Sequence, residues 1–285
     1  MTPTVALTIA GSDSGGGAGI QADLKTFAAF GVFGTSAITA LTAQNTRGVR
    51  GVVATPADFV VAQVDAVLDD LPVAAVKTGM LATSDIVTAV GKIAAAGRLP
   101  NLVVDPVMVA SSGDRLLEPQ AERAYIEALL PHAVLATPNL REAEVLLDGP
   151  IRTLADQHAA AAAIGALGPR AVVVKGGHPV ADAAEDAVDV VWDGGSTYEL
   201  RGPRVATANN HGTGCTFAAA AAATLARGAD VRAACQAAKE YVSRAVTGGA
   251  AWRLGGGHGP LDHFGWTGAG ALAGEPPDVA GATAP

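Results

Sequence analysis

The sequence lacks the features of several large protein classes. Its two cysteines, Cys215 and Cys235, have neither the spacing of a metal-ligand motif nor the number needed for a disulfide framework. No apolar run reaches the length of a bilayer before a charge, Gly or Pro interrupts it. The formal net charge of −8 at pH 7 argues against a nucleic-acid or membrane partner. The first residues lack the basic segment of a secretion signal, so we predict a cytoplasmic protein.

Two common nucleotide-binding motifs are also missing. The chain has no G-x-x-x-x-G-K-[ST] segment, which P-loop proteins use to bind phosphate. The segment Gly15-Gly16-Gly17-Ala18-Gly19 follows a predicted strand and is weakly typical of dinucleotide binding. However, no acidic residue ends a second strand where that fold would need one. The sequence therefore does not favour an NAD site.

What the sequence does contain is an alternation of short and long apolar segments. Hydrophobic residues make up 49% and charged residues 16% of the chain, as in globular proteins. The predicted strands, each a nearly continuous apolar run, cover residues 5–9, 73–77, 102–106, 133–137 and 171–175. The predicted helices between them cover residues 20–30, 57–71, 84–96, 119–130, 140–147 and 153–167. This order predicts an α/β protein with a mostly parallel sheet covered on both faces.

The C-terminal third has a different organisation. Segments 187–192 and 197–200 flank Asp193-Gly194-Gly195, which predicts a β-hairpin at one end of the sheet. Two consecutive helices are predicted over residues 214–226 and 231–247. After Phe264 the chain becomes rich in Gly, Ala, Pro and Thr without periodicity. We therefore predict one domain over residues 1–264 and a disordered tail over residues 265–285.

Candidate site residues follow the ends of the predicted strands. They are Gly11 to Gly19, Lys77 to Met80, Asp105, Asn139 and Lys175 to Gly177. In open α/β sheets, ligands bind beyond the carboxyl ends of the strands, so these residues are expected to meet at one site.

The strongest local motif is Asn210-His211-Gly212-Thr213-Gly214-Cys215-Thr216, which precedes an Ala-rich helix. Its two glycines allow backbone N–H groups to turn toward a ligand. The first turn of the helix adds unpaired N–H groups and the positive end of the helix dipole. The motif therefore predicts an anion site suited to phosphoryl transfer, although a glycine-rich turn that only starts a helix has the same pattern.

Residues 4–264 resemble the hydroxymethylpyrimidine/phosphomethylpyrimidine kinases of the ribokinase-like superfamily. The resemblance rests on segments spread over nearly the whole chain. They are Ala10-Gly11-Ser12-Asp13-Ser14, Gly16-Gly17-Ala18-Gly19-Ile20-Gln21-Ala22-Asp23-Leu24-Lys25-Thr26, Thr42-Ala43-Gln44-Asn45-Thr46, Lys77-Thr78-Gly79-Met80-Leu81, Asp105-Pro106-Val107-Met108, Thr137-Pro138-Asn139, Val174-Lys175-Gly176-Gly177-His178 and His211-Gly212-Thr213-Gly214-Cys215-Thr216.

The resemblance implies a three-layer αβα ribokinase-like fold, ATP and Mg²⁺ as cofactors, and a homodimer. The implied reaction is phosphorylation of 4-amino-5-hydroxymethyl-2-methylpyrimidine to its monophosphate and then to its diphosphate, in thiamine biosynthesis. Two alternatives stay open. One is a pyridoxine or pyridoxal kinase on the same fold. The other is a non-catalytic sensor of pyrimidine phosphate, which the retained Gly212, Gly214, Cys215 and Lys175 argue against.

For catalysis, the resemblance assigns Cys215 as the base that takes the hydroxyl proton, beside Gly212 and Gly214. A helix N-terminus is expected to lower the thiol pKa from about 8.5. The second phosphorylation needs no base, because a phosphate monoester is already an anion. Lys175 is expected to reach the ATP phosphates. The alternatives are a buried, apolar Cys215 and a solvent-exposed Lys175 at a strand end.

For the ligands, the resemblance divides the remaining residues between nucleotide, metal and pyrimidine. It implies that Asn139, Lys175 and Thr213 bind the nucleotide, and that Asp105 and Glu142 hold Mg²⁺, Glu142 through a water molecule. Asn139 and Glu142 would equally form a helix capping box.

The resemblance assigns the pyrimidine to Gly11, Asp23, Gln44, Met80 and Val107. The amide of Gln44 matches an aminopyrimidine edge, since it offers both a donor and an acceptor. Asp23 would hold the hydroxymethyl oxygen or a ring substituent, while Met80 and Val107 would form apolar walls. The alternatives are a solvated Asp23 and a Met80 that belongs to the core.

Overall fold

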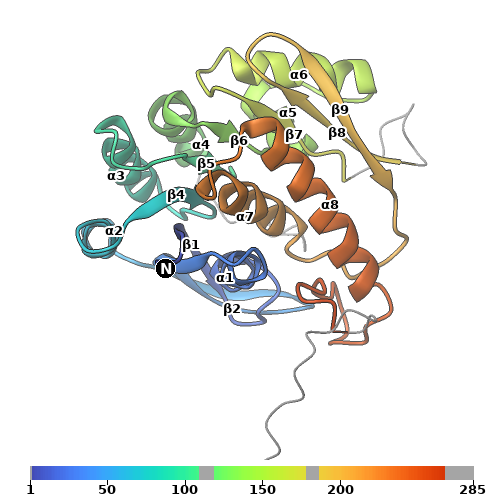
Figure 1. Cartoon of the computed structure of the whole chain (residues 1–285), viewed down its shortest axis with the longest axis horizontal. Coiled ribbons are helices and arrows are strands. Elements are labelled where there is room, and N and C mark those ends of the chain that lie inside the picture. Colours follow the sequence, from blue (N-terminus) through green and yellow to red (C-terminus); the bar gives the residue numbers. More distant parts are fainter. Residues whose placement is uncertain (1, 109–118, 178–185, 267–285) are drawn as a thin grey trace, which may run out of the picture.

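A nine-stranded sheet, in the order β3-β2-β1-β4-β5-β6-β7-β8-β9, runs through the computed structural model, which describes residues 2–108, 119–177 and 186–266 (Figure 1). The strands are β1 (Val5–Asp13), β2 (Phe33–Asn45), β3 (Gly48–Ala54), β4 (Val73–Thr78), β5 (Val103–Val104), β6 (Leu135–Ala136), β7 (Val172–Val174), β8 (Asp186–Trp192) and β9 (Thr197–Pro203). Strands β2, β1 and β4 to β7 pair in parallel, and β3, β8 and β9 add antiparallel edges.

The helices cover both faces of the sheet, which confirms the predicted three-layer fold (Figure 1). They are α1 (Gly19–Ala29), α2 (Ala57–Leu68), α3 (Ser84–Ala95), α4 (Pro119–Ala124), α5 (Leu140–Leu147), α6 (Leu154–Gly165), α7 (Thr213–Ala226) and α8 (Val231–Gly249). Because side chains alternate along a strand, Leu7 and Ile9 of β1 pack toward α2 and α3, whereas Ala6 packs toward α1 and α7. Cys235 is buried in the core on the α1 and α7 side of the sheet.

The segment predicted as one helix over residues 119–130 is not uniform. Helix α4 passes into a π-helical turn (Tyr125–Leu129) and a 3₁₀ turn (Leu130–His132). Pro131 lacks the N–H that an α-helix would need there. Inside the core, the Tyr125 hydroxyl donates a 2.9 Å hydrogen bond to the carbonyl of Gly79. The change of helix type therefore coincides with a proline and a buried tertiary contact.

The β2–β3 hairpin is absent from the strands predicted above. Its segments mix Gly, Ala, Ser and Arg with β-branched residues, and most of β3 is exposed, so no continuous apolar run marks them. The hairpin at the other edge, β8 and β9, confirms the prediction. From residue 267 onward the predicted tail lies outside the described residues. In the described part of the chain, no helix is long and apolar enough to cross a membrane.

Candidate active site

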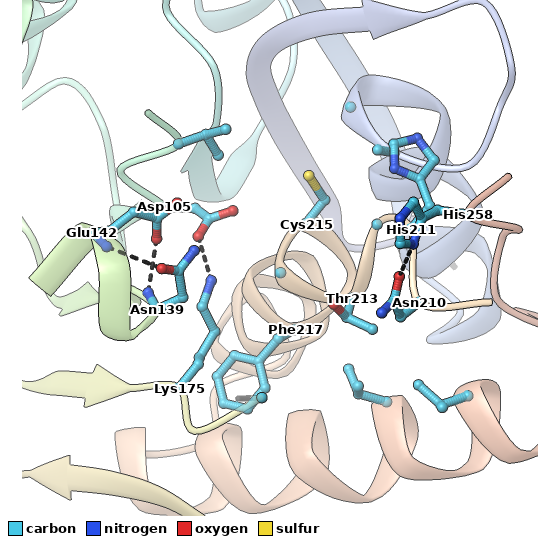
Figure 2. Close-up of a pocket in the computed structure, with 18 of the residues that line it drawn as sticks. Asp105, Asn139, Glu142, Lys175, Asn210, His211, Thr213, Cys215, Phe217 and His258 are labelled. Atoms are coloured by element: carbon cyan, nitrogen blue, oxygen red, sulfur yellow. Dashed lines mark hydrogen bonds and ion pairs between the residues drawn. The ribbon is translucent and has the colours of Figure 1, made fainter. Parts of the chain in front are cut away.

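A cavity of about 660 Å³ opens at the carboxyl ends of the parallel strands. It brings together every predicted site residue except Asp23. These residues are Gly11, Gln44, Met80, Asp105, Val107, Asn139, Glu142, Lys175, Gly212, Thr213, Gly214 and Cys215. Figure 2 shows Thr213 and Cys215 on the first turn of α7, with Asp105, Asn139, Glu142 and Lys175 grouped to one side.

The anion site predicted at residues 210–216 has the geometry its sequence suggests. Gly212 has a φ of +88°, a left-handed conformation that glycine adopts without strain. The following residue starts α7, and the Thr216 N–H already donates a 2.9 Å bond to the Gly212 carbonyl. No side chain of the described residues caps this helix start. The Thr213 N–H donates a 3.3 Å bond to the Asn210 carbonyl, so this helix start offers the N–H groups of Gly214 and Cys215 to an anion.

Lys175 lies beside this helix start. Its Nζ is 2.7 Å from Asp105 Oδ1, and a Cβ atom at Gly214 would lie 3.0 Å from the same nitrogen. Burial alone would lower the pKa of Lys175, but Asp105 and Glu142 raise it above the usual value. Lys175 is thus a partly enclosed, permanent cation at the start of α7, and it is not the solvated strand-end residue of the alternative interpretation.

Asp105 has one oxygen engaged and one free. Its Oδ1 also accepts a 3.1 Å hydrogen bond from the Thr137 hydroxyl, whereas Oδ2 is buried without a partner among the described residues. A buried carboxylate oxygen that lacks a partner is costly unless a ligand or solvent satisfies it. In the described part of the chain, no group of three or more His, Cys, Asp or Glu side chains is arranged to hold a metal.

Asn139 and Glu142 form the capping box that the sequence allows. Asn139 Oδ1 accepts from the Glu142 N–H at 3.0 Å, and Glu142 Oε2 accepts from the Asn139 N–H at 2.7 Å. Burial raises the pKa of Glu142 to about 7, with Lys175 acting against this rise and Asp105 adding to it. The capping interpretation is confirmed, and both residues also line the cavity.

Cys215 lies in the cavity wall on the first turn of α7 and is half-buried. Burial raises the pKa of its thiol to about 11, although Lys77 and a hydrogen bond from the Gly19 N–H lower it. The lowered thiol pKa predicted from the helix N-terminus is therefore wrong, because the loss of solvation has the larger effect. At neutral pH the thiol holds its proton.

Asp23 is the one predicted residue that does not line the cavity. It is fully buried behind the wall, where its Oδ2 accepts from Lys77 Nζ at 2.9 Å and from the Thr8 hydroxyl at 2.7 Å. Burial raises the pKa of Asp23, while Lys77 opposes the rise. The structure thus places Lys77 between Asp23 and the cavity. In the sequence, Lys77 belongs to the candidate segment at a strand end, but nothing there predicts a function for it.

The end of the cavity formed by β1, β2 and β4 combines an amide with apolar walls. Backbone groups of Gln44 exchange hydrogen bonds with the Ser14 hydroxyl, at 2.6 and 2.9 Å. The side-chain amide has no partner among the described residues and lines the cavity. Met80 packs with Ala40, Ala82 and Val107. A Cβ atom at Gly11 would collide with the terminal methyl of Met80, so a side chain there would displace the end of Met80.

Helix α8 contributes residues that the sequence did not single out. Lys239 donates to Asp189 Oδ2 at 3.0 Å and to the Ala187 carbonyl at 2.7 Å. Val242 and Val246, on the same helix, line the cavity with Phe217 of α7. Nothing in the local sequence marked these residues, because they come from a predicted packing helix and from the hairpin beside it.

The comparisons with known proteins agree with this arrangement. A family model described as phosphomethylpyrimidine kinase matches residues 13–262. The chain is 50% identical over 266 residues to the hydroxymethylpyrimidine/phosphomethylpyrimidine kinase of Streptomyces coelicolor, which covers 93% of this chain and 96% of that protein.

Two solved structures share the fold. The ADP complex of Bacillus subtilis pyridoxal kinase has a TM-score of 0.83 and 40% identity, with 92% of this chain and 98% of that chain covered. Staphylococcus aureus pyridoxal kinase in complex with AMP-PCP and pyridoxal has a TM-score of 0.82 and 36% identity, with 93% and 96% covered. The similar proteins are therefore kinases, and they act on two kinds of aromatic ring.

Proposed function

The chain belongs to the phosphomethylpyrimidine kinase family, and we propose that it phosphorylates 4-amino-5-hydroxymethyl-2-methylpyrimidine twice, with ATP as donor, in thiamine biosynthesis. One observation carries this proposal. A single cavity holds an unpaired glutamine amide at one end and a cation beside an uncapped helix start at the other. We place this activity in the cytoplasm.

At the donor end, the residues favour the phosphates of ATP. The first N–H groups of α7, together with Thr213 and Gly214, would bind the γ-phosphate, where negative charge accumulates during transfer. Lys175 would add a positive charge from the other side. Asn139 lies at the start of α5 in the same part of the cavity, and the apolar Val242, Val246 and Phe217 suit the adenine ring.

Asp105 and Glu142 fit a Mg²⁺ ion. The partnerless Oδ2 of Asp105 is a hard oxygen ligand, and Glu142 adds a second carboxylate at the same end of the cavity. Two carboxylates are sufficient, since Mg²⁺ in kinases is usually bound by one or two of them with phosphates and water. When bound, Mg²⁺ would neutralise charge on the phosphates. Glu142 keeps its capping role and would act through a water molecule.

At the acceptor end, Gln44 would read the aminopyrimidine edge. Its carbonyl can accept from the exocyclic amine while its NH₂ group donates to a ring nitrogen. Met80 and Val107 would pack on the ring, and the missing side chain at Gly11 leaves room for the end of Met80. Asp23 would act on the site through Lys77, since Lys77 separates it from the cavity.

Cys215 would differ in importance between the two steps. In the first step the hydroxymethyl oxygen attacks the γ-phosphorus, the bond to the β,γ-bridging oxygen breaks, and the hydroxyl proton must leave. The Cys215 thiolate would accept that proton, although its pKa of about 11 makes the thiolate scarce at neutral pH. In the second step an oxygen of the monophosphate attacks and no proton needs to be removed.

The exposed face of the β2–β3 hairpin supports a homodimer. Leu41 and Val53 are directly paired across the hairpin and are 54% and 69% exposed, and Phe59 at the start of α2 is 60% exposed. Exposed apolar side chains such as the Leu41–Val53 pair favour burial against another protein surface. Light scattering should show that the wild type is a dimer. The Val53→Lys variant should have a larger monomer fraction than the wild type.

Mass spectrometry of the products tests the reaction. The protein is incubated with Mg-ATP and either the pyrimidine, pyridoxal or no acceptor. We expect the pyrimidine to gain one and then two phosphates. Gain of a single phosphate would contradict the proposed second phosphorylation. Phosphorylation of pyridoxal alone would overturn the pyrimidine specificity. Hydrolysis of ATP without any phosphorylated acceptor would refute the kinase proposal.

A further inference from the structure

Asp13 joins two loops that are almost 200 positions apart in the chain. Its Oδ2 is hydrogen-bonded to His211 Nε2 at 2.9 Å. The N–H groups of Gly17 and Ala18 donate to the same oxygen at 3.0 and 2.8 Å. Its Oδ1 accepts from the Gly15 N–H at 2.7 Å. The carboxylate therefore organises the glycine loop, residues 13–19, and binds it to the anion loop, residues 210–214.

The backbones of the two loops are closely fitted around this contact. A Cβ atom at Gly212 would collide with the Gly17 carbonyl, and one at Gly17 would lie 2.6 Å from the His211 ring. A shift of the glycine loop would therefore be transmitted to the anion loop and to the first turn of α7.

The electrostatics favour the contact. Burial alone would raise the pKa of Asp13, but the hydrogen bonds from His211 and from backbone N–H groups lower it below the usual value. The carboxylate is therefore ionised throughout the neutral range. His211 is largely buried and lines the cavity, and on its other side the anion loop is held by the C-terminal segment, where the His211 N–H donates to the Gly259 carbonyl at 3.0 Å.

Each loop serves a different ligand in the proposed function. The glycine loop continues from Gly11, at the acceptor end, while the anion loop leads into the helix start at the donor end. We infer that Asp13 and His211 are positioning residues that hold the glycine loop against the anion loop and so keep the acceptor hydroxyl in line with the γ-phosphate of ATP. This inference rests on the proposed kinase function and adds two residues to it.

The test compares His211→Ala, His211→Gln and Asp13→Asn with the wild type, using whichever acceptor the wild type phosphorylates. For His211→Ala we expect kcat to fall about 10²-fold with KM for ATP nearly unchanged, because misalignment of about 1 Å has that effect. The amide nitrogen of glutamine can replace Nε2 as a donor, so His211→Gln should regain about tenfold. Asp13→Asn should resemble His211→Ala.

The ratio of ATP consumed to acceptor phosphorylated separates positioning from simple stability. It should rise in His211→Ala and Asp13→Asn, because water replaces a misaligned acceptor while ATP still binds. His158→Ala is the matched control, since His158 binds Thr197 and Glu199 at 2.7 and 3.1 Å away from the cavity. The control should keep the wild-type ratio.

Several outcomes would overturn the inference. One is a wild-type ratio of ATP consumed to acceptor phosphorylated in both His211→Ala and Asp13→Asn. Another is a His211→Gln variant whose kcat is no higher than that of His211→Ala. The third is a His158→Ala control that loses as much kcat as His211→Ala. A wild type that phosphorylates no acceptor would instead refute the proposed function. The two failures are therefore distinguishable.

Discussion

The site contains two lysine–aspartate pairs with the same chemistry in different surroundings. Lys77 binds Asp23 at 2.9 Å and Lys175 binds Asp105 at 2.7 Å, and each lysine lies at or just after the end of a parallel strand. In both pairs the second carboxylate oxygen has no partner among the described residues. Both side chains of the first pair are 0% exposed, whereas the Lys175 side chain is 11% exposed to the cavity.

This difference in exposure separates a sealed pair from an open pair. The sealed pair, Lys77 and Asp23, lies between α1 and β4 near the acceptor end. Its charges are out of water, so each depends on the other. The open pair, Lys175 and Asp105, borders the donor end, where a phosphate can share the lysine. We therefore expect the sealed pair to control folding and the open pair to control catalysis.

Lys77→Met should break the sealed pair with the largest effect. It leaves Asp23 buried without its cation, and removal of one partner of a buried pair costs about 3–5 kcal/mol. Urea unfolding should show this loss. The double variant Lys77→Met/Asp23→Leu should recover most of it, because an apolar pair needs no solvation. A single variant as stable as the wild type would show that the pair is not sealed.

Lys175→Met should have its main effect on the reaction. Loss of a charge that stabilises the transferred phosphoryl group should lower kcat by about 10²–10³-fold. The free energy of unfolding should fall less than for Lys77→Met, because loss of the lysine head group would open Asp105 to water in the cavity that Lys175 borders. Steady-state kinetics and urea unfolding of the same samples measure both.

Lys175→Arg is the matched control for the open pair. It keeps the charge but changes its shape, so stability should return while kcat recovers only in part. Wild-type kcat in Lys175→Met would remove this lysine from the donor end and end the distinction between the two pairs.

The contrast also shows what could be predicted from the sequence. Lys175 and Asp105 were predicted as site residues because each follows an apolar strand whose carboxyl end must face the ligand edge of the sheet. The three-layer fold followed from the same alternation. These features depend on a few neighbouring residues, and a local pattern therefore reveals them.

Features that depend on distant contacts were missed or misjudged. Asp23 was assigned to the pyrimidine, although Lys77, 54 positions away, encloses it. The contact between Asp13 and His211 spans 198 positions and has no local signature. The thiol pKa of Cys215 was misjudged because a helix start is visible in the sequence, whereas the burial that outweighs it is not. Position at a strand end was predictable, whereas the burial of single polar side chains was not.

Gln44→Leu tests whether the acceptor and donor ends of the cavity bind their ligands independently. It leaves the aminopyrimidine edge unpaired, which should weaken pyrimidine binding by about 1–3 kcal/mol and leave ATP binding unchanged. Calorimetric titration with each ligand measures this. Gln236→Leu is the control, since Gln236 binds Glu240 at 2.7 Å on the exposed side of α8. Equal loss of ATP affinity in Gln44→Leu would contradict the division.

An effect of about tenfold per pH unit concerns Cys215, whose thiol lies in the field of both pairs. Lys77 lowers its pKa, Asp23 and Asp105 raise it, and its thiolate in turn raises the pKa of Lys175. The base is the deprotonated form, and its pKa of about 11 lies above the assay range. The rate of alcohol phosphorylation should therefore rise about tenfold per pH unit between about pH 7 and 9.

Phosphorylation of the monophosphate should be flat over the same range, because its second pKa is near ~6. Cys215→Ala should remove the slope of the first step and leave the second step unchanged. Cys215→Asp should give a flat first step, since a carboxylate is already ionised at pH 7. Parallel profiles for the two steps in the wild type would show that Cys215 shapes the start of α7 without taking the proton. Because Lys77 lowers the thiol pKa more than Asp23 raises it, the folded double variant Lys77→Met/Asp23→Leu should also slow the first step at each pH. The sealed pair would then affect catalysis through Cys215 alone, whereas the open pair acts on the phosphate directly.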